Sequence, residues 1–250
     1  MITDKLWFKW MMAGILLLVA AGLFVFCYLS YRKKNVNPVK FVAVTGVFSA
    51  LAAILYCVPI FNFHLPFLPS FLSIHLDEIP IFIVGFLYGP VSSVMVTLIK
   101  TLIKLPMSHT ACVGEFGDFL LTCIFVLPSV ILYERRRKLS SVFIGFGISF
   151  TLQILSAMIL NVYALIPFYS YFYHMPYEKL LKACQAANPA IKDVAWSYAL
   201  LAVLPMNAIK DGIVLAVTFL LYKRLHILID RIGTQKHGPK DEREIDLLDD

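Results

Sequence analysis

Long apolar stretches with few or no charged residues alternate with short polar connectors along most of the 250-residue chain. Each of these stretches holds about 20 residues or more, the length at which an α-helix crosses the hydrocarbon core of a bilayer. The pattern therefore predicts an all-α membrane protein. The apolar stretches are residues 10–30, 41–63, 79–99, 114–133, 139–167 and 196–222.

The stretch 79–99 is interrupted by Gly89 and Pro90, a pair that favours a turn. We therefore expect two short helices here, joined at this pair, and seven helices in the whole chain. Lys100 and Lys104 follow one helical turn apart. Their alkyl stems are expected to carry the ammonium groups to the membrane interface.

The first stretch, residues 10–30, has two interpretations. Lys5 and Lys9 resemble the basic start of a signal peptide, and small residues at 20–21 would permit cleavage. The apolar run nevertheless continues to Ser30 and is followed by a basic cluster at 32–34, which favours a retained helix. The sequence thus predicts an extra N-terminal helix and basic linker (residues 1–36), a membrane core (37–226) and a charged, disordered tail (227–250).

Composition supports this class and also predicts an orientation. The chain is 60% hydrophobic and 15% charged, with a mean hydropathy of +0.79, which is typical of a polytopic membrane protein. The net charge of +6 is spread over short connectors and does not indicate nucleic-acid binding. Placing the basic connectors 32–40, 135–138 and 223–224 in the cytoplasm puts the N-terminus outside and the C-terminus inside. The loops 59–78, 104–114 and 167–193 then face outward.

Polar residues inside the later spans are the first candidates for a site. A charge at membrane depth costs about 2.5–3.5 kcal/mol, so Lys210 and Asp211 should face the bundle interior, a partner or a ligand. Asn207 lies three residues before Lys210 and shares its helical face. Lys210 and Asp211 are either a structural ion pair or, because neighbours diverge on a helix, each has a separate partner. Asn161 and Gln153 could instead be hydrogen-bonding contacts between helices.

Acidic residues stand at two predicted outer helix starts. Asp77 and Glu78 precede one short helix, and Glu115 and Asp118 begin the next span. In both places the carboxylates either stabilise the helix N-terminus or belong to a site. The aromatic segment 168–173 is likewise either an interfacial belt or a cover for a ligand.

Catalytic and metal-binding motifs do not occur in the sequence. Five cysteines form no CxxC pair or cluster with histidine, so neither a metal site nor a disulfide framework is indicated. The phosphate loop GxxxxGK[ST] and the motifs HExxH and GxSxG are absent as well. We expect no enzyme, and any ATP used must be hydrolysed by another chain.

Small residues in the second span permit close approach of another helix. They follow the small-xxx-small pattern in two overlapping pairs. The approaching helix could belong to this chain or to a partner. The residues are Gly46, Ser49, Ala50 and Ala53.

Four segments together resemble the substrate-binding S components of energy-coupling-factor (ECF) vitamin transporters, and most closely the riboflavin-specific ones. The segments are HLDEIPIFIVGFLYGP (75–90), VGEFGDFL (113–120), ILNVYALIPFY (159–169) and LPMNAIKDGIVLAVTFLLYKRL (204–225). The similarity covers residues 37–225, and the N-terminal helix departs from it. It implies a six-helix core that binds a vitamin from outside and docks on a transmembrane coupling subunit with two cytoplasmic ATPases.

The resemblance also assigns roles to residues. It implies that riboflavin is the transported ligand, with no resident cofactor, and that Gly46, Ser49, Ala50 and Ala53 contact the coupling subunit. Amides and an ammonium can hydrogen-bond to the imide edge of a flavin, and carboxylates can accept from its ribityl hydroxyls. The outer loops contain no arginine, the side chain best suited to bind a phosphate group, so an unphosphorylated flavin is favoured. Another vitamin or small heterocycle, or a membrane enzyme, is the alternative. The implied ligand contacts are Asn161, Asn207, Lys210, Leu72, Ser73, Asp77, Glu115 and Asp118.

Overall fold

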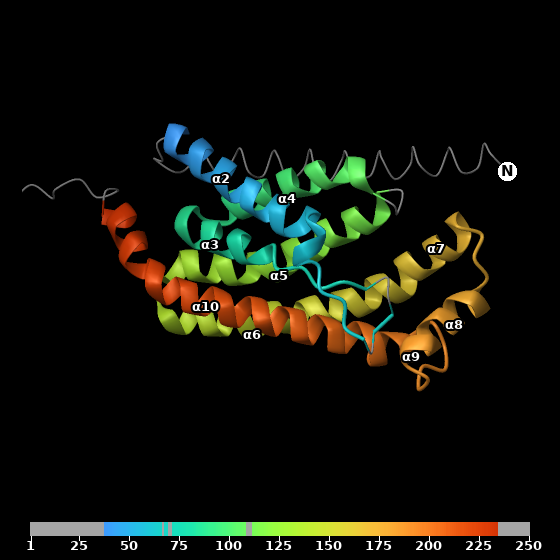
Figure 1. Cartoon of the computed structure of the whole chain (residues 1–250). Coiled ribbons are helices and arrows are strands. Elements are labelled where there is room, and N and C mark those ends of the chain that lie inside the picture. Colours follow the sequence, from blue (N-terminus) through green and yellow to red (C-terminus); the bar gives the residue numbers. More distant parts are fainter. Residues whose placement is uncertain (1–37, 67, 70–71, 109–111, 235–250) are drawn as a thin grey trace, which may run out of the picture.

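The computed structural model describes residues 38–66, 68–69, 72–108 and 112–234 (Figure 1). The predicted first helix, its linker and the end of the tail from residue 235 lie outside this part. The described chain is almost entirely helical. Its elements are α2 (Pro38–Cys57), α3 (Glu78–Tyr88), α4 (Pro90–Lys104), α5 (Val113–Arg136), α6 (Leu139–Leu160), α7 (Ile166–Phe172), α8 (Tyr177–Ala187), α9 (Trp196–Tyr198) and α10 (Leu204–Thr234).

Within the described residues, five helical runs are long and apolar enough to cross a membrane. They cover residues 38–57, 90–107, 113–136, 139–172 and 196–222, and the shorter apolar helix α3 completes the set. The predicted six-helix core is thereby confirmed. α10 continues beyond its expected end at Tyr222, so residues 227–234 of the predicted tail are helical.

The turn between α3 and α4 forms at the predicted position. Gly89 has φ 94°, a conformation that L side chains rarely adopt, and Pro90 starts α4. Ser92 Oγ donates to the backbone oxygen of Gly89, and Ser93 Oγ donates to that of Ile81 on α3. Glycine, proline and these two hydroxyls together fold the two helices against each other.

Aromatic side chains fill the bundle at the end where this turn lies. Phe82 meets Phe125 edge to face, with ring centroids 5.1 Å apart. Phe86 packs in the same way on Tyr133, at 5.1 Å, and on Tyr222, at 5.5 Å. These rings come from α3, α5 and α10, so they hold together helices that are far apart in sequence.

The opposite end carries the less regular elements. Figure 1 shows α7, α8 and α9 together at one end of the molecule, with the α2–α3 connection (residues 58–77) running toward them. Two π-helical segments, Asn161–Leu165 and Ala199–Val203, lead into α7 and α10. Irregular backbone and polar side chains thus share the end that the sequence predicts to face outward.

Candidate functional site

A polar cavity of about 310 Å³ lies between the α2–α3 connection, the start of α5, the end of α6 and α10. Seven of the eight ligand contacts implied by the sequence line it, and the eighth, Asp77, binds Lys100, which also binds the lining residue Asp118. The lining residues are Tyr56, Asn62, Leu72, Ser73, His75, Lys104, Gly114, Glu115, Gly117, Asp118, Leu121, Gln153, Asn161, Leu165, Tyr169, Met206, Asn207 and Lys210.

The two asparagines sit at the π-helical segments. Asn161 begins the first segment, and its Nδ2 donates to the backbone oxygen of Ala157 at 2.9 Å. Asn207 follows the second segment by one turn, and its Nδ2 donates to the backbone oxygen of Val203 at 2.8 Å. Each side-chain amide is therefore oriented by its own helix. The two segments contact each other, and such widened turns often occur at functional sites.

The prolines near these segments give a physical reason for them. Pro205 and Pro167 lie inside continuous helical runs, and neither can donate to the carbonyl four residues earlier. A wider turn accommodates the lost hydrogen bond without ending the helix. Pro205, two residues before Asn207, and Pro167, six residues after Asn161, were thus the sequence signals for these segments.

Lys100 corrects the expectation that its ammonium reaches the membrane interface. The side chain is fully buried, and its Nζ donates to Asp77 Oδ2, to Asp118 Oδ2 at 2.9 Å and to Thr122 Oγ1 at 3.3 Å. The ammonium also lies 4.5 Å from the ring centroid of Tyr56. Two carboxylates, a hydroxyl and an aromatic face replace water around this charge, so it is stable at depth.

Asp77 lies at the start of α3, where its charge suits the helix N-terminus, but it makes no capping hydrogen bond to the described backbone of α3. Its carboxylate instead pairs with Lys100. Glu78, the next residue, pairs with Lys210 of α10. Adjacent carboxylates at the start of α3 therefore reach lysines on two different helices.

Lys210 lines the cavity and has a separate partner, as the helical geometry predicts, whereas Asp211 has no ion-pair partner in the described structure other than Lys210. Its Nζ donates to Glu78 and lies 3.5 Å from Asp211 Oδ1. Both carboxylate oxygens of buried Asp211 lack a hydrogen-bond partner in the described structure. With three N–H groups, the Lys210 ammonium retains donor capacity for a ligand in the cavity.

The start of α5 is fixed by a short polar chain. Ser108 Oγ donates to Glu115 Oε2 at 2.7 Å and accepts from the backbone N–H of Cys112 at 3.0 Å. Glu115 lies in the first turn of α5 and also lines the polar cavity. Its position suits the helix N-terminus, and its role in a ligand site stays a prediction.

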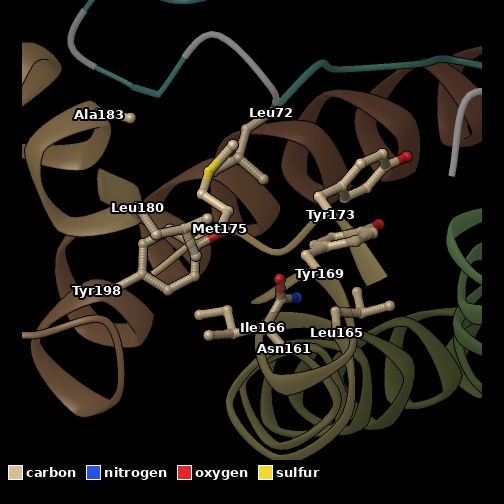
Figure 2. Close-up of a pocket in the computed structure, with 10 residues that line it drawn as sticks. All are labelled: Leu72, Asn161, Leu165, Ile166, Tyr169, Tyr173, Met175, Leu180, Ala183 and Tyr198. Atoms are coloured by element: carbon tan, nitrogen blue, oxygen red, sulfur yellow. The ribbon is translucent and has the colours of Figure 1, made fainter. Parts of the chain in front are cut away.

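A second, largely apolar cavity of about 380 Å³ adjoins the polar one (Figure 2). The two share Leu72, Asn161, Leu165 and Tyr169. Figure 2 shows the rings of Tyr169 and Tyr173 beside Asn161, with Met175 and Tyr198 across the cavity. Other lining residues are Ile166, Leu180 and Ala183.

The aromatic segment 168–173 accordingly has more than one role. Tyr169 and Tyr173 line the apolar cavity, with ring centroids 6.1 Å apart. Phe168 is buried in the core, whereas Tyr171 is exposed. One face of this short helix covers the cavity, and another is available to the membrane interface.

The small-residue face of α2 divides into two pairs. Gly46 and Ala50 are exposed, and a Cβ added at Gly46 would meet no atom within 4 Å. Ser49 and Ala53 are buried, and Ser49 Oγ donates to the backbone oxygen of Thr45 at 2.7 Å. The expectation that all four form one outer face is therefore corrected: Ser49 and Ala53 pack inside this chain.

Comparison with known proteins gives the family. The sequence model of the family described as "ECF transporter, substrate-specific component" matches residues 40–222. The chain belongs to this family. Its members are components of transporters and not enzymes, which agrees with the absence of catalytic motifs. The chain is accordingly a multi-pass membrane protein.

Individual relatives agree with this assignment. The riboflavin transporter RibU of Staphylococcus aureus (strain TCH60) is 30% identical over 202 residues, covering 80% of this chain and 98% of the relative. The riboflavin transporter FmnP of Bacillus subtilis (strain 168) is 28% identical over 179 residues, covering 70% and 87%. A solved S component of a bacterial ECF transporter superposes with a TM-score of 0.61 at 25% identity, covering 77% of this chain and 99% of that structure.

Proposed function

We propose that this protein is the riboflavin-binding S component of an ECF transporter, which captures the vitamin outside the cell. Partner subunits, a transmembrane coupling subunit and two ATPases, would then drive its release inward. One observation carries the proposal: the residues that the sequence motifs mark as ligand contacts gather around one polar cavity that adjoins an aromatic one.

The chemistry of the paired cavities suits a flavin. The ligand has a flat tricyclic body, an imide edge that donates and accepts, and a chain of hydroxyls. Asn161, Asn207 and Lys210 supply amides and an ammonium for the imide, and Glu115 and Asp118 supply acceptors for hydroxyls. Tyr169 and Tyr173 supply ring faces for the flat body. The names of the two relatives support the same ligand.

In the proposed orientation the cavity opens toward the outside of the cell. The N-terminus is also outside, and the C-terminus is in the cytoplasm. Arg135 and Arg136 end α5 beyond the aromatic cluster that contains Tyr133, at the end of the bundle opposite the cavity. Clustered basic residues favour the cytoplasmic side, so this arrangement supports an outward-facing site. Gly46 and Ala50 remain the proposed contacts for the coupling subunit.

Binding of riboflavin to detergent-purified protein tests the ligand assignment, with quenching of flavin fluorescence as the readout. We expect Asn161→Ala and Asn207→Ala each to weaken binding about 5- to 150-fold, because each removes a hydrogen-bonding group from a largely desolvated wall. Thr151→Ala is the matched control, since Thr151 is an exposed residue of α6 that bonds only its own helix.

Two results would contradict the assignment. If the parent protein does not quench riboflavin, the ligand is a different vitamin or heterocycle, and unlabelled candidates should be screened by thermal stabilisation. If the parent binds and both asparagine variants bind equally well, the cavity is not the flavin site. Equal weakening by Thr151→Ala would show that the effects are not specific to the cavity.

A further inference from the structure

The α2–α3 connection carries a row of hydrogen-bonded side chains that includes Ser73, an implied ligand contact, and His75, which has no assigned role. Phe63 and Ile74 form an isolated antiparallel bridge, with backbone N–O distances of 3.1 and 2.8 Å. In an antiparallel pair, the residues flanking the bridge also face each other. The bridge therefore places Asn62 opposite His75 at the cavity wall.

The ring nitrogens of His75 connect two residues that line the cavity. Nδ1 lies 2.9 Å from Asn62 Oδ1, and Nε2 lies 3.0 Å from Ser73 Oγ. An amide oxygen only accepts, so Nδ1 carries the proton and the neutral ring leaves Nε2 as an acceptor. Ser73 must then donate its hydroxyl proton to Nε2. Its oxygen lone pairs remain for the cavity.

The surroundings of the ring favour this neutral form. Tyr56 of α2 packs edge to face on His75, with ring centroids 5.2 Å apart. Burial lowers the pKa of His75 below its usual range, and Lys210 and Lys100 act in the same direction, whereas Asp77 and Asp118 oppose the shift.

We propose that His75 is a positioning residue for the ligand, which holds Ser73 in the cavity wall as a hydrogen-bond acceptor. This inference rests on the proposed riboflavin-binding function. An imide N–H can only donate, and a ribityl hydroxyl donates readily, so an acceptor fixed at Ser73 suits both parts of a flavin.

Protonation of His75 would reverse the direction of the hydrogen bond between His75 and Ser73. Nε2 would then donate to Ser73 Oγ, and the Ser73 proton would have to turn into the cavity, toward a ligand donor. Ligand binding thus prefers neutral His75. Affinity should be constant above the ordinary histidine pKa of about 6.5 and should fall as the pH drops through the lowered pKa.

Riboflavin titrations between about pH 5 and pH 8 test this role in three variants. His75→Phe keeps a ring against Tyr56 but no nitrogen, so it should bind about 2- to 10-fold more weakly near pH 8 and show no acid loss. His75→Gln restores an acceptor for Ser73 and should recover most of the affinity, again without acid loss. His64→Phe, an exposed change in the same connection, should behave like the parent.

An NMR spectrum of the ligand-free protein tests the protonation state of His75 without depending on the ligand. In ¹⁵N-histidine-labelled protein at neutral pH, the His75 signal, assigned by its absence in His75→Phe, should show the proton on Nδ1. A proton on Nε2 would overturn the inference even if riboflavin binds tightly.

The binding outcomes also separate the two proposals. If the parent binds riboflavin and His75→Phe has the same affinity and pH profile, the positioning role is wrong and the proposed function stands. If the parent does not bind riboflavin, the proposed function fails, and the role of His75 toward a flavin fails with it.

Discussion

Replacing Lys210 should lower both thermal stability and riboflavin affinity, and a single and a double variant can measure the two effects separately. Lys210→Met leaves Glu78 as a buried carboxylate without its partner, and Glu78 Oε2 already lacks one in the described structure. Breaking a buried ion pair from one side costs about 3–5 kcal/mol. At about 2–4 °C per kcal/mol for a chain of this size, the midpoint of thermal unfolding should fall by about 6–20 °C.

Removing both charges isolates the contribution to binding. The double variant Lys210→Met/Glu78→Met replaces the pair with apolar side chains of similar length, so most of the lost thermal stability should return. Recovery should be incomplete, because Asp211, 3.5 Å from the ammonium, also loses its cation. If Lys210 donates to the ligand, the double variant should still bind riboflavin about 10- to 150-fold more weakly than the parent.

Thermal unfolding in detergent, monitored by tryptophan fluorescence, and riboflavin titration of the same samples provide the two measurements. Lys192→Met, at an exposed lysine, is the control and should change neither. Unchanged unfolding of the single variant would refute the structural pairing. Parent-like binding by the double variant would refute ligand contact by Lys210 while leaving the pairing intact.

Two further predictions concern orientation and coupling. On a cysteine-depleted background, an impermeant thiol reagent added outside cells should label Asn188→Cys but not Ser140→Cys, and the reverse pattern would invert the proposed topology. Ala50→Trp, on the exposed small-residue face of α2, should block transport with parent-like riboflavin binding, because an indole prevents close helix approach. Ile148→Trp, at an exposed position of α6, is its control. Loss of riboflavin binding instead of transport in Ala50→Trp would mean that Ala50 packs within the chain.

The sequence contained enough to predict the core helices and seven of the residues that line the polar cavity. Span lengths and the Gly89–Pro90 pair define six segments, because the bilayer thickness and backbone sterics leave few alternatives. Lys210, Asn207 and Asn161 were identifiable because polar groups in apolar spans need partners inside the bundle. The resemblance to the family then added Ser73 and Glu115, which line the cavity.

The pairing of the charges could not be read from sequence. Lys210 and Glu78 are 132 residues apart, and Lys100 and Asp77 are 23 apart, so only the packing of the helices brings them together. Lys100 was expected at the membrane interface because it lies near a predicted helix end. The sequence did not show that Asp77 and Asp118 lie beside it in the fold. His75 and Asn62 were missed because the backbone bridge that aligns them joins two irregular segments.

The length of α3 explains why these charges lie so deep. Its eleven residues rise about 16 Å, roughly half of the hydrocarbon thickness, so its start lies within the membrane when its other end is near the cytoplasmic side. Asp77 and Glu78 begin α3, and their directions diverge by about 100° around its axis. One therefore reaches Lys100 of α4 and the other Lys210 of α10. In the proposed orientation the half-length helix would let the polar cavity extend toward the membrane interior, and the two ion pairs tie the start of α3 to Asp118 and Lys210 in the cavity wall.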